Sequence, residues 1–323
     1  MAAWLESPDH LVVDLRNIAA VDLAPLLDEE TAAWRAALDW DFEPSAELVR
    51  RFVGMQALSG FALLEGARTI GYSYFIREEK KGLIGDLYVC QRDRTVQREN
   101  ALIEATLEAL WRSPGVRRVE AQLLLLESPL KRKVPFASRF KPYPRRFLEA
   151  SARQALDLEA REPEGIAIAP WTEAQQDDSA RLVAAAYRGH IDSEINDQYR
   201  SPSGSRRFLS NIVQYPGCGT FFPQASFAAV TANGARSELC GISLASLVAR
   251  DTGHITQICV APSQRGKGVG YALLRRSMLA LAAQGCRTVG LTVTSKNISA
   301  IRLYEQMGFA DRRDFAAYVW DSL

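Results

Sequence analysis

Three glycines at alternate positions form the stretch of this sequence that is best suited to chemistry, Arg265-Gly266-Lys267-Gly268-Val269-Gly270. Glycine has no Cβ, so a ligand can approach the backbone N–H groups of such a stretch closely. Residues 255–260 alternate and are rich in β-branched side chains, which predicts a strand before the glycines. Residues 271–283 repeat apolar side chains at helical spacing, which predicts a helix after them. The start of a helix offers unpaired N–H donors and partial positive charge, so this turn predicts a pyrophosphate site.

Two better-known nucleotide motifs do not fit these glycines. A dinucleotide fingerprint requires G-x-G-x-x-G, and a P-loop requires G-x-x-x-x-G-K-[ST]. Here the glycines are spaced by two, and Lys267 is followed by Gly268 rather than by serine or threonine. The pattern that is present is R-x-x-G-x-G, from Arg265 to Gly270.

A second motif lies downstream of the glycines. It contains Asn297, Ala300, Tyr304, Gly308 and Phe309, in a predicted helix that ends in Y-x-x-x-G-F. Together, the two motifs resemble the cofactor motifs of the GNAT family of N-acetyltransferases, in the family's order and separation. The resemblance covers the second half of the chain and implies acetyl-CoA (coenzyme A) as the cofactor.

The resemblance also implies where the cofactor binds. It places the pyrophosphate on the backbone amides of Val269, Gly270 and their neighbours, and the thioester beside strand 255–260, where the next strand splays away. A backbone N–H near Cys259 or Val260 is then the candidate donor to the oxyanion. The predicted cofactor-binding residues are Ile258, Cys259, Val260, Arg265, Gly266, Lys267, Gly268, Val269, Gly270, Asn297, Ala300 and Tyr304.

Tyr304 matches the tyrosine that serves as general acid in the family, near the sulfur of the cofactor. A phenol of pKa about 10 suits a departing thiolate. The alternative is that Tyr304 is only a core aromatic of an amphipathic helix. Asn297 likewise has two interpretations, because it can bind the pantetheine arm or cap its helix.

The general base is less clear, because the family often uses a carboxylate on the central strands. The cofactor strand and its approach offer His254, Gln257 and Cys259, but no Asp or Glu. A strand cysteine is usually just buried, and the family's usual route is direct transfer in a ternary complex, so we do not expect Cys259 to act as a nucleophile.

The polar segment 189–199 offers other candidates, since in the family this region walls the acceptor pocket. It contains His190, Asp192 and Glu194. A carboxylate at position 192 or 194 could bind or deprotonate an ammonium group, and histidine titrates near neutrality. We therefore predict Tyr304, Glu194 and His190 as catalytic residues, with a solvated polar loop as the alternative for the segment.

The predicted elements occur in nearly the same order twice, which indicates an internal duplication. We predict an α/β fold of two tandem GNAT-like domains, residues 1–160 and 161–323, each a mixed, mostly antiparallel sheet flanked by helices. The first half has no glycine in residues 91–97 and lacks the second motif. We therefore expect it to be a degenerate domain that does not bind acyl-CoA, and we expect 161–323 to be catalytic.

Local patterns give the individual elements. Predicted helices cover residues 24–38, 45–53, 94–111, 174–188, 206–213 and 271–283, and Asp22, Ser45 and Thr172 are candidate N-caps. Predicted strands cover residues 11–15, 61–64, 69–76, 83–90, 116–126, 166–171, 226–231, 239–248, 255–260, 288–294 and 315–320. A turn is expected at residues 232–235.

Residues 131–146 are basic, with interleaved aromatics and three prolines. We expect an irregular region there rather than a nucleic-acid site.

Composition excludes several classes of protein. The 323 residues carry a net charge of +1, so no global field favours nucleic acid or an anionic membrane. No apolar run reaches about 18 residues, and the first six residues lack the basic start of a signal peptide. The five cysteines show no paired spacing, which predicts reduced thiols in a cytoplasmic protein. Three histidines without a Cys/His cluster predict no metal site.

These patterns lead to one preferred function. We predict an N-acetyltransferase that moves an acetyl group from acetyl-CoA to a primary amine of a small molecule, by direct attack in a ternary complex. Tandem members of the family include mycothiol synthase-like enzymes. The alternatives are acetylation of a protein or peptide, and a non-catalytic acyl-CoA sensor. We expect a monomer, because duplicated halves can pack as an internal pseudo-dimer.

Overall fold

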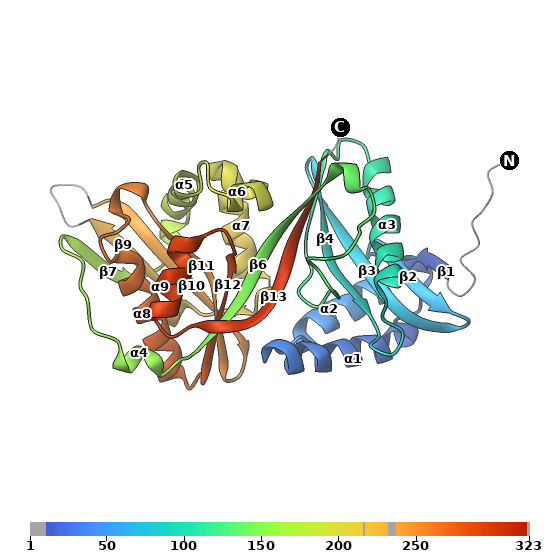
Figure 1. Ribbon diagram of the computed structural model, residues 1–323, viewed down its shortest axis with the longest axis horizontal. Coiled ribbons are helices and arrows are strands. Elements are labelled where there is room, and N and C mark those ends of the chain that lie inside the picture. Colours follow the sequence, from blue (N-terminus) through green and yellow to red (C-terminus); the bar gives the residue numbers. More distant parts are fainter. Residues whose placement is uncertain (1–10, 216, 232–236, 322–323) are drawn as a thin grey trace. The chain divides into compact units, whose positions relative to one another are not determined.

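A computed structural model of the chain describes residues 11–215, 217–231 and 237–321 (Figure 1). Among these residues it contains two compact units. The first comprises residues 11–37, 42–143 and 315–321, and the second comprises residues 38–41 and 144–314. The turn predicted at residues 232–235 and the first six residues lie outside the described ranges.

The first unit is a mixed sheet with helices on both faces. Its strands follow the order β1-β2-β3-β4-β5-β13, in which only β4 and β5 are parallel neighbours. Tyr72 on β3 bonds Glu30 of α1, and Ser73 bonds Thr106 of α3, so α1 and α3 cover opposite faces. The elements are β1 (Leu11–Asp14), α1 (Ala20–Leu38), α2 (Glu43–Gly54), β2 (Gly60–Glu65), β3 (Arg68–Glu78), β4 (Lys81–Val89), α3 (Val96–Arg112) and β5 (Arg118–Gln122).

The second unit repeats this plan. Its strands follow the order β6-β12-β11-β10-β9-β7, with β8 beside β10, and only β11 and β12 are parallel. The elements are β6 (Phe140–Ser151), α4 (Gln154–Asp157), β7 (Ile166–Pro170), α5 (Gln176–Ala186), α6 (Asp192–Ile195), α7 (Pro202–Gln214), β8 (Thr220–Phe221), β9 (Phe227–Thr231), β10 (Leu239–Ala249), β11 (Thr252–Val260), α8 (Val269–Gln284), β12 (Thr288–Thr294), α9 (Ile298–Gln306) and β13 (Ala310–Asp321).

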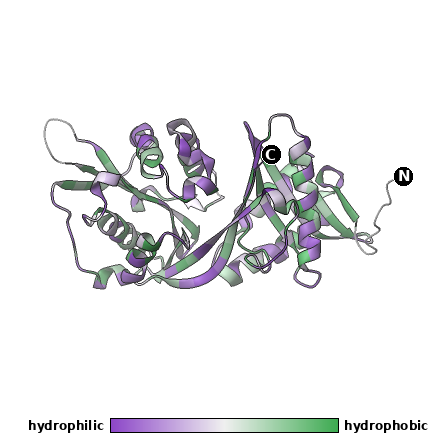
Figure 2. Ribbon diagram, turned by 45° about the horizontal axis from the view of Figure 1, so that its top comes forward, coloured by the Kyte–Doolittle hydropathy of each residue, from purple (hydrophilic) through white to green (hydrophobic). Residues whose placement is uncertain are grey.

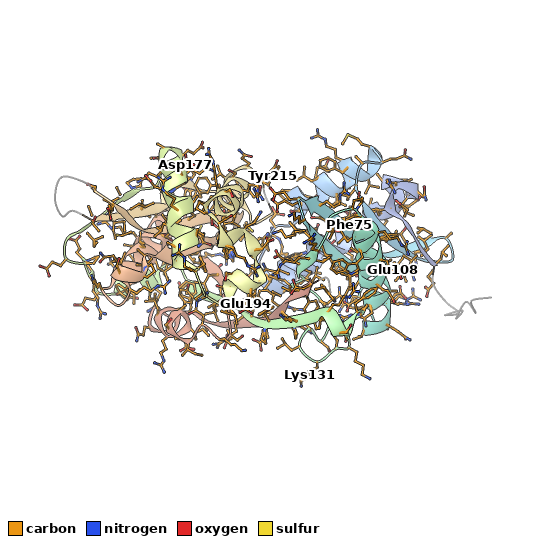
Figure 3. The ribbon with its side chains drawn as sticks, turned by 90° about the horizontal axis from the view of Figure 1, so that it is seen from above. Phe75, Glu108, Lys131, Asp177, Glu194 and Tyr215 are labelled. Atoms are coloured by element: carbon orange, nitrogen blue, oxygen red, sulfur yellow. The ribbon has the colours of Figure 1, made fainter. Side chains whose placement is uncertain are left out.

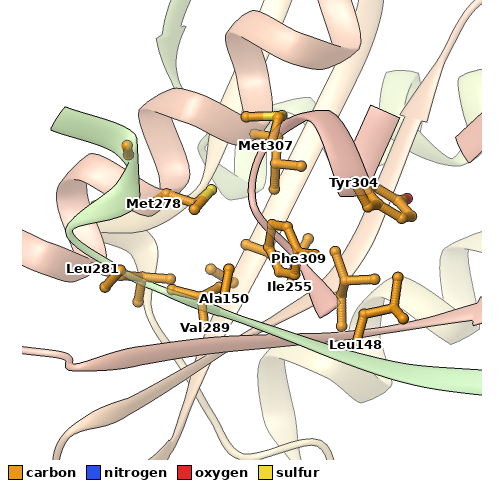
Figure 4. Packing of buried hydrophobic residues seen from close by; sticks show 14 of the residues in the cluster. Leu148, Ala150, Ile255, Met278, Leu281, Val289, Tyr304, Met307 and Phe309 are labelled. Carbon is orange, nitrogen blue, oxygen red and sulfur yellow. The ribbon is translucent and has the colours of Figure 1, made fainter. Parts of the chain in front are cut away.

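Two apolar clusters hold the helices of the second unit to opposite faces of its sheet. One cluster joins α8 and α9 to inward residues of β6, β11 and β12, and Tyr304 lies at its edge (Figure 4). The other joins α5 and α7 to β10 and β11. Figure 2 shows that the helices carry both hydrophobic and hydrophilic residues, as expected for helices that cover one face of a sheet. The predicted α/β fold with mixed, mostly antiparallel sheets is therefore confirmed.

The last strand of each half belongs to the other half's unit. Residues 145–151 of β6 pair with β12, and residues 317–321 of β13 pair with β5. The units therefore differ from the linear division at residue 160. Alternating side chains predict a strand but not its partner, which explains why the sequence does not show this exchange.

The prediction of an irregular region over residues 131–146 is wrong for its second part, because β6 begins at Phe140. Pro142 and Pro144 are tolerated because they precede Arg145, where pairing with β12 starts, so their missing N–H groups break no bond of that ladder.

The residues at which the helices begin differ from the predicted N-caps in two of three cases. Ser45 lies inside α2, which begins at Glu43, and Asp22 lies in the first turn of α1 rather than at its cap. Thr172 does form a capping box with Gln175, for a short 3₁₀ turn that leads into α5. No helix in the described ranges has the length and apolar character needed to cross a membrane.

The duplication extends to the register of the central strands. In each unit the parallel pair has four paired positions, ending at Ile84 with Ala121 and at Ile255 with Leu291. The register then shifts by one residue against the preceding strand, which places a β-bulge at Gly85 and at Thr256. Asp86 and Gln257 therefore occupy equivalent positions in the two units.

Candidate active site

The site is built where β11 and β12 part. Among the described residues, the two strands are not paired beyond Ile255 and Leu291, although β11 continues to Val260 and β12 to Thr294. The bulge at Thr256 begins this separation, and the Thr256 hydroxyl stabilises it by donating to the Leu244 carbonyl at 3.0 Å. The expected splay is confirmed, and it leaves backbone groups of β11 facing a gap.

The directions of the backbone N–H groups at the end of β11 show which of them can donate a hydrogen bond into this gap. The Ala261 N–H donates to the Cys240 carbonyl on the β10 side at 2.8 Å. Consecutive N–H groups of a strand point to opposite sides, so the amide of Val260 is directed away from β10 and toward the gap. Of the two candidates, Cys259 and Val260, the geometry favours Val260 as the donor to an oxyanion.

The glycine loop has the backbone that its sequence predicts. Gly266 and Gly268 have φ values of +76° and +81°, which residues with a Cβ rarely adopt, and Gly268 is the N-cap of α8. At both positions the space that a Cβ would occupy is open. An open backbone at the start of a 16-residue helix fits a pyrophosphate group. Arg265 ties the loop to α5, because its guanidinium donates to the Ala186 carbonyl.

The second motif forms α9. Asn297 caps this helix, since its Oδ1 accepts the amide of Ala300 at 3.3 Å and the Ser299 hydroxyl at 3.2 Å. Tyr304 is buried, and Figure 4 shows its ring against the apolar cluster with the oxygen directed away from it. Burial raises the pKa of the Tyr304 phenol, the Asp192 charge raises it further, and Arg145 opposes this shift. The ring is thus part of the core, while the hydroxyl is within the influence of two charged groups.

Asp192 is the carboxylate that connects the site. The Thr294 hydroxyl, at the free end of β12, donates to Asp192 Oδ1. The other carboxylate oxygen lies 3.7 Å from His190 Nδ1. Burial raises the pKa of Tyr187 and Tyr199, and the Asp192 charge adds to both shifts. One largely buried carboxylate therefore acts on the residue that follows α5, on α9 and on the end of β12 together.

His190 and Glu194 are placed differently from each other. His190 Nδ1 accepts the backbone amide of Asp192 at 3.2 Å, so the neutral imidazole carries its proton on Nε2. Glu194 is exposed on α6 (Figure 3), whereas the side chain of Asp192 is only 14% exposed. Between the two carboxylates considered as candidates, Asp192 and Glu194, burial favours Asp192 for the chemistry.

An aromatic pair that the sequence did not reveal completes the site. Tyr187 and Tyr199 stack at 4.4 Å between ring centroids. Gln257 of β11 joins them, because its Nε2 donates to the Tyr187 hydroxyl at 3.1 Å and its Oε1 accepts the Tyr199 hydroxyl at 3.4 Å. A buried polar residue in the middle of an apolar strand was the available signal.

Comparison with known proteins agrees with this geometry. Residues 192–309 match the acetyltransferase (GNAT) family. These residues form a GNAT acetyltransferase domain. The chain is 29% identical over 163 residues to mycothiol acetyltransferase of Kocuria rhizophila, covering 49% of this chain and 50% of that one. It is 38% identical over 85 residues to streptothricin acetyltransferase of Streptomyces lavendulae, covering 26% and 44%. The chain spans about half the length, or less, of these curated relatives.

A solved structure matches the whole chain. The tandem GNAT protein from the clavulanic acid biosynthesis pathway has a TM-score of 0.62 and 17% sequence identity, covering 97% of this chain and 98% of that one. At this identity the likeness concerns the fold, and it agrees with two GNAT-like units.

Two other titratable residues of the GNAT domain are unsuited to catalysis at neutral pH. Burial raises the pKa of the Cys259 thiol to about 12, so it stays protonated among the apolar residues under α5. Burial lowers the pKa of His254 to about 4, and Arg145 adds to this effect. His254 lies between the rings of Trp40 and Phe147, with centroids 5.1 Å and 5.7 Å away.

The loop after β4 in the first unit differs from the glycine loop of the GNAT domain. Asp93 pairs with Arg68 at 2.7 Å and with Arg98 at 3.2 Å, and Glu29 accepts the Gln91 amide at 2.6 Å. The Thr95 hydroxyl caps α3. The loop is thus held by charged side chains rather than by glycines, and the absence of acyl-CoA binding by this unit stays a prediction.

Proposed function

We propose that the chain is an N-acetyltransferase that transfers the acetyl group of acetyl-CoA to a primary amine of a small molecule, by direct attack in a ternary complex. The observation that carries this proposal is the gap between β11 and β12, which opens beside a glycine loop with the backbone of a pyrophosphate site and close to Tyr304. The names of the two curated relatives, which refer to small amine-containing molecules, support this class of acceptor.

One residue of this chain is then assigned to each chemical requirement of acetyl transfer. The Val260 amide donates to the carbonyl oxygen as it gains negative charge. Asp192 holds the ammonium form of the acceptor and takes up its proton, directly or through water. The amine nitrogen bonds to the carbonyl carbon as the carbon–sulfur bond breaks. Tyr304 donates a hydrogen bond and then its proton to the departing sulfur; its raised pKa keeps the phenol protonated until then. The second proton that the nitrogen loses on becoming an amide passes through water to the Tyr304 oxygen, which restores the phenol.

Arg145 and the tyrosine pair have supporting parts. Arg145 donates to the Thr292 hydroxyl at 3.1 Å, and its charge opposes that of Asp192 at Tyr304 and Tyr199. The Tyr187–Tyr199 stack and Gln257 form a rigid wall on the acceptor side of β11.

Two measurements test the proposal. Calorimetry with acetyl-CoA should give a single site per chain in the wild type and none in the Gly268→Asp, Gly270→Asp double variant. Release of CoA across a panel of amines should fall by at least about tenfold in Tyr304→Phe. Tight binding with equal background release by wild type and Tyr304→Phe would show a binding module instead of an enzyme. A second site, or binding that survives the double substitution, would place the cofactor elsewhere.

A further inference from the structure

A basic pocket lies along the segment that carries His190 and Asp192. It has a volume of about 380 Å³ and is formed by α5, by the segment that follows it and by the start of α7. Figure 3 marks these elements by Asp177 on α5 and Glu194 on α6. The lining residues that matter here are Arg181, Arg188, Arg200, Tyr187, Gly189 and Ser193.

The arginines leave positive charge in this pocket. Arg181 forms an ion pair with Asp178. Arg200 is held in place because its Nε donates to the Ser193 carbonyl at 2.7 Å, which leaves its terminal N–H groups available. Arg188 is exposed, and its guanidinium has no hydrogen bond or ion pair within the part of the chain that the structure describes. Two of the three guanidinium groups therefore have no carboxylate partner among the residues that the structure describes.

The pocket adjoins the candidate active site through shared residues. The hydroxyl of Tyr187, which lines the pocket, accepts the bond from Gln257 of β11. His190 lies beside Gly189 in the sequence, and Asp192 lies beside Ser193. Gly189, which lines the pocket next to His190, has no side chain, and the space where a Cβ would lie is open.

We propose that this pocket binds an anionic group, a carboxylate or a phosphate, of the amine acceptor. Arginine is suited to this task because its planar guanidinium matches both groups with two parallel hydrogen bonds. An acceptor with its amine at Asp192 and its anion at Arg188 and Arg200 would be selected over an acceptor that has only the amine. This inference rests on the proposed acetyl transfer.

The anionic group that these arginines bind could belong to the cofactor instead, as the 3′-phosphate of CoA. Arg265 of the glycine loop donates to the Ala186 carbonyl, next to Tyr187, so the cofactor loop also adjoins this wall. The experiment must therefore separate an anion on the acceptor from an anion on the cofactor.

The first arm compares amines that differ only in the anion, such as ethanolamine with phosphoethanolamine and cadaverine with lysine. With the full chain and acetyl-CoA, kcat/KM should be about tenfold or more higher for the anionic member. Arg188→Gln should remove most of this preference through KM, and Arg188→Lys should keep part of it. Arg206→Gln is the matched control, because Arg206 is an exposed arginine on α7 that pairs with Asp177 and does not line the pocket.

The second arm compares acetyl-CoA with 3′-dephospho-acetyl-CoA. If Arg188→Gln raises KM only for acetyl-CoA and leaves the amine pairs unchanged, the pocket serves the cofactor and the acceptor proposal is overturned. Equal kcat/KM within each amine pair in the wild type would also overturn it.

A binding measurement keeps this test independent of turnover. Calorimetry with phosphoethanolamine, in the presence of CoA, should show binding in the wild type that weakens about tenfold in Arg188→Gln. If no amine is acetylated but this difference is found, the proposed function fails while the anion pocket stands. Absent binding, or equal binding by both proteins, overturns the pocket.

Discussion

A carboxylate at position 192 determines the charge at the centre of the candidate site. The sequence offered Asp192 and Glu194 two residues apart, and no pattern distinguishes which of them faces a ligand. The structure separates them, because the Asp192 side chain accepts from Thr294 and adjoins His190 while Glu194 is exposed. The long-range partners, Thr294 and Tyr304, come from elements about a hundred residues away, which sequence spacing cannot show.

Asp192→Asn should lower kcat by about 100-fold, because the amide can neither hold an ammonium charge nor accept its proton. The measurement is CoA release at saturating acetyl-CoA with the best amine of the panel. Glu194→Gln is the control and should stay within about twofold of the wild type. A larger loss in Glu194→Gln than in Asp192→Asn would return the role to Glu194.

A second pair of carboxyl groups, Glu30 and Asp86, is buried in the first unit. Glu30 accepts the Tyr72 hydroxyl at 2.7 Å and the Trp34 Nε1–H at 3.3 Å, and it shares a hydrogen bond with Asp86. Burial raises the pKa of Asp86 to about 6 and raises that of Glu30 well above its usual range. The folded unit therefore binds protons that the unfolded chain releases near pH 4.

Stability should fall as pH rises through about 6, because a group with a raised folded pKa stabilises only while it is protonated. Thermal unfolding between pH 4.5 and 8 should show this decrease. In Glu30→Gln the decrease should be smaller, since the amide keeps the size and the hydrogen-bonding oxygen but carries no charge near Asp86. A pH dependence equal to that of the wild type would show that the pair does not titrate as described.

At the scale of elements, the glycine loop and α8 show what a local pattern can predict. The strand, the turn and the helix were all expected, and β12 matches its predicted range of 288–294. Backbone conformation explains this success, because Gly266 and Gly268 are needed for their positive φ values whatever lies around them. The β-bulge at Thr256 and the strand separation depend on partners far away in the chain. The family resemblance pointed to the strand separation, and no sequence pattern pointed to the bulge.

Two glycines of the loop, Gly268 and Gly270, should respond differently to alanine. Gly268→Ala forces a Cβ into the left-handed region at φ +81° and should cost about 1–2 kcal/mol of stability. Gly270 has no such φ, and a Cβ there would meet Leu303 and Val260 at an ordinary 3.6 Å. Gly270→Ala should therefore leave the melting temperature unchanged or raise it slightly. Equal losses for both variants would contradict the described turn.

At the scale of the whole molecule, the exchange of final strands makes each unit depend on both halves of the chain. The second unit needs β6 beside β12, and the first needs β13 beside β5. Sequence patterns could not predict this arrangement, because a β-strand can pair with any sheet edge that presents free N–H and C=O groups.

Residues 161–323 expressed alone should fail to bind acetyl-CoA, although they contain the glycine loop and Tyr304, because their sheet lacks β6. Co-expression with residues 1–160 should restore binding, which calorimetry on the purified pair can measure. The continuous fragment of residues 140–323 is the control, because it keeps β6, and it should retain more structure by circular dichroism. Full binding by 161–323 alone would show that β6 is dispensable.

The place of β13 also has a consequence for synthesis on the ribosome. Translation runs from the N-terminus, so β5 is made about two hundred residues before its neighbour β13 (Ala310–Asp321) emerges. Throughout that interval the nascent first half has an open edge at β5, a feature that promotes pairing with other chains. This edge is covered only once β13 has left the ribosome, so a premature stop before β13 would leave the first unit prone to aggregation.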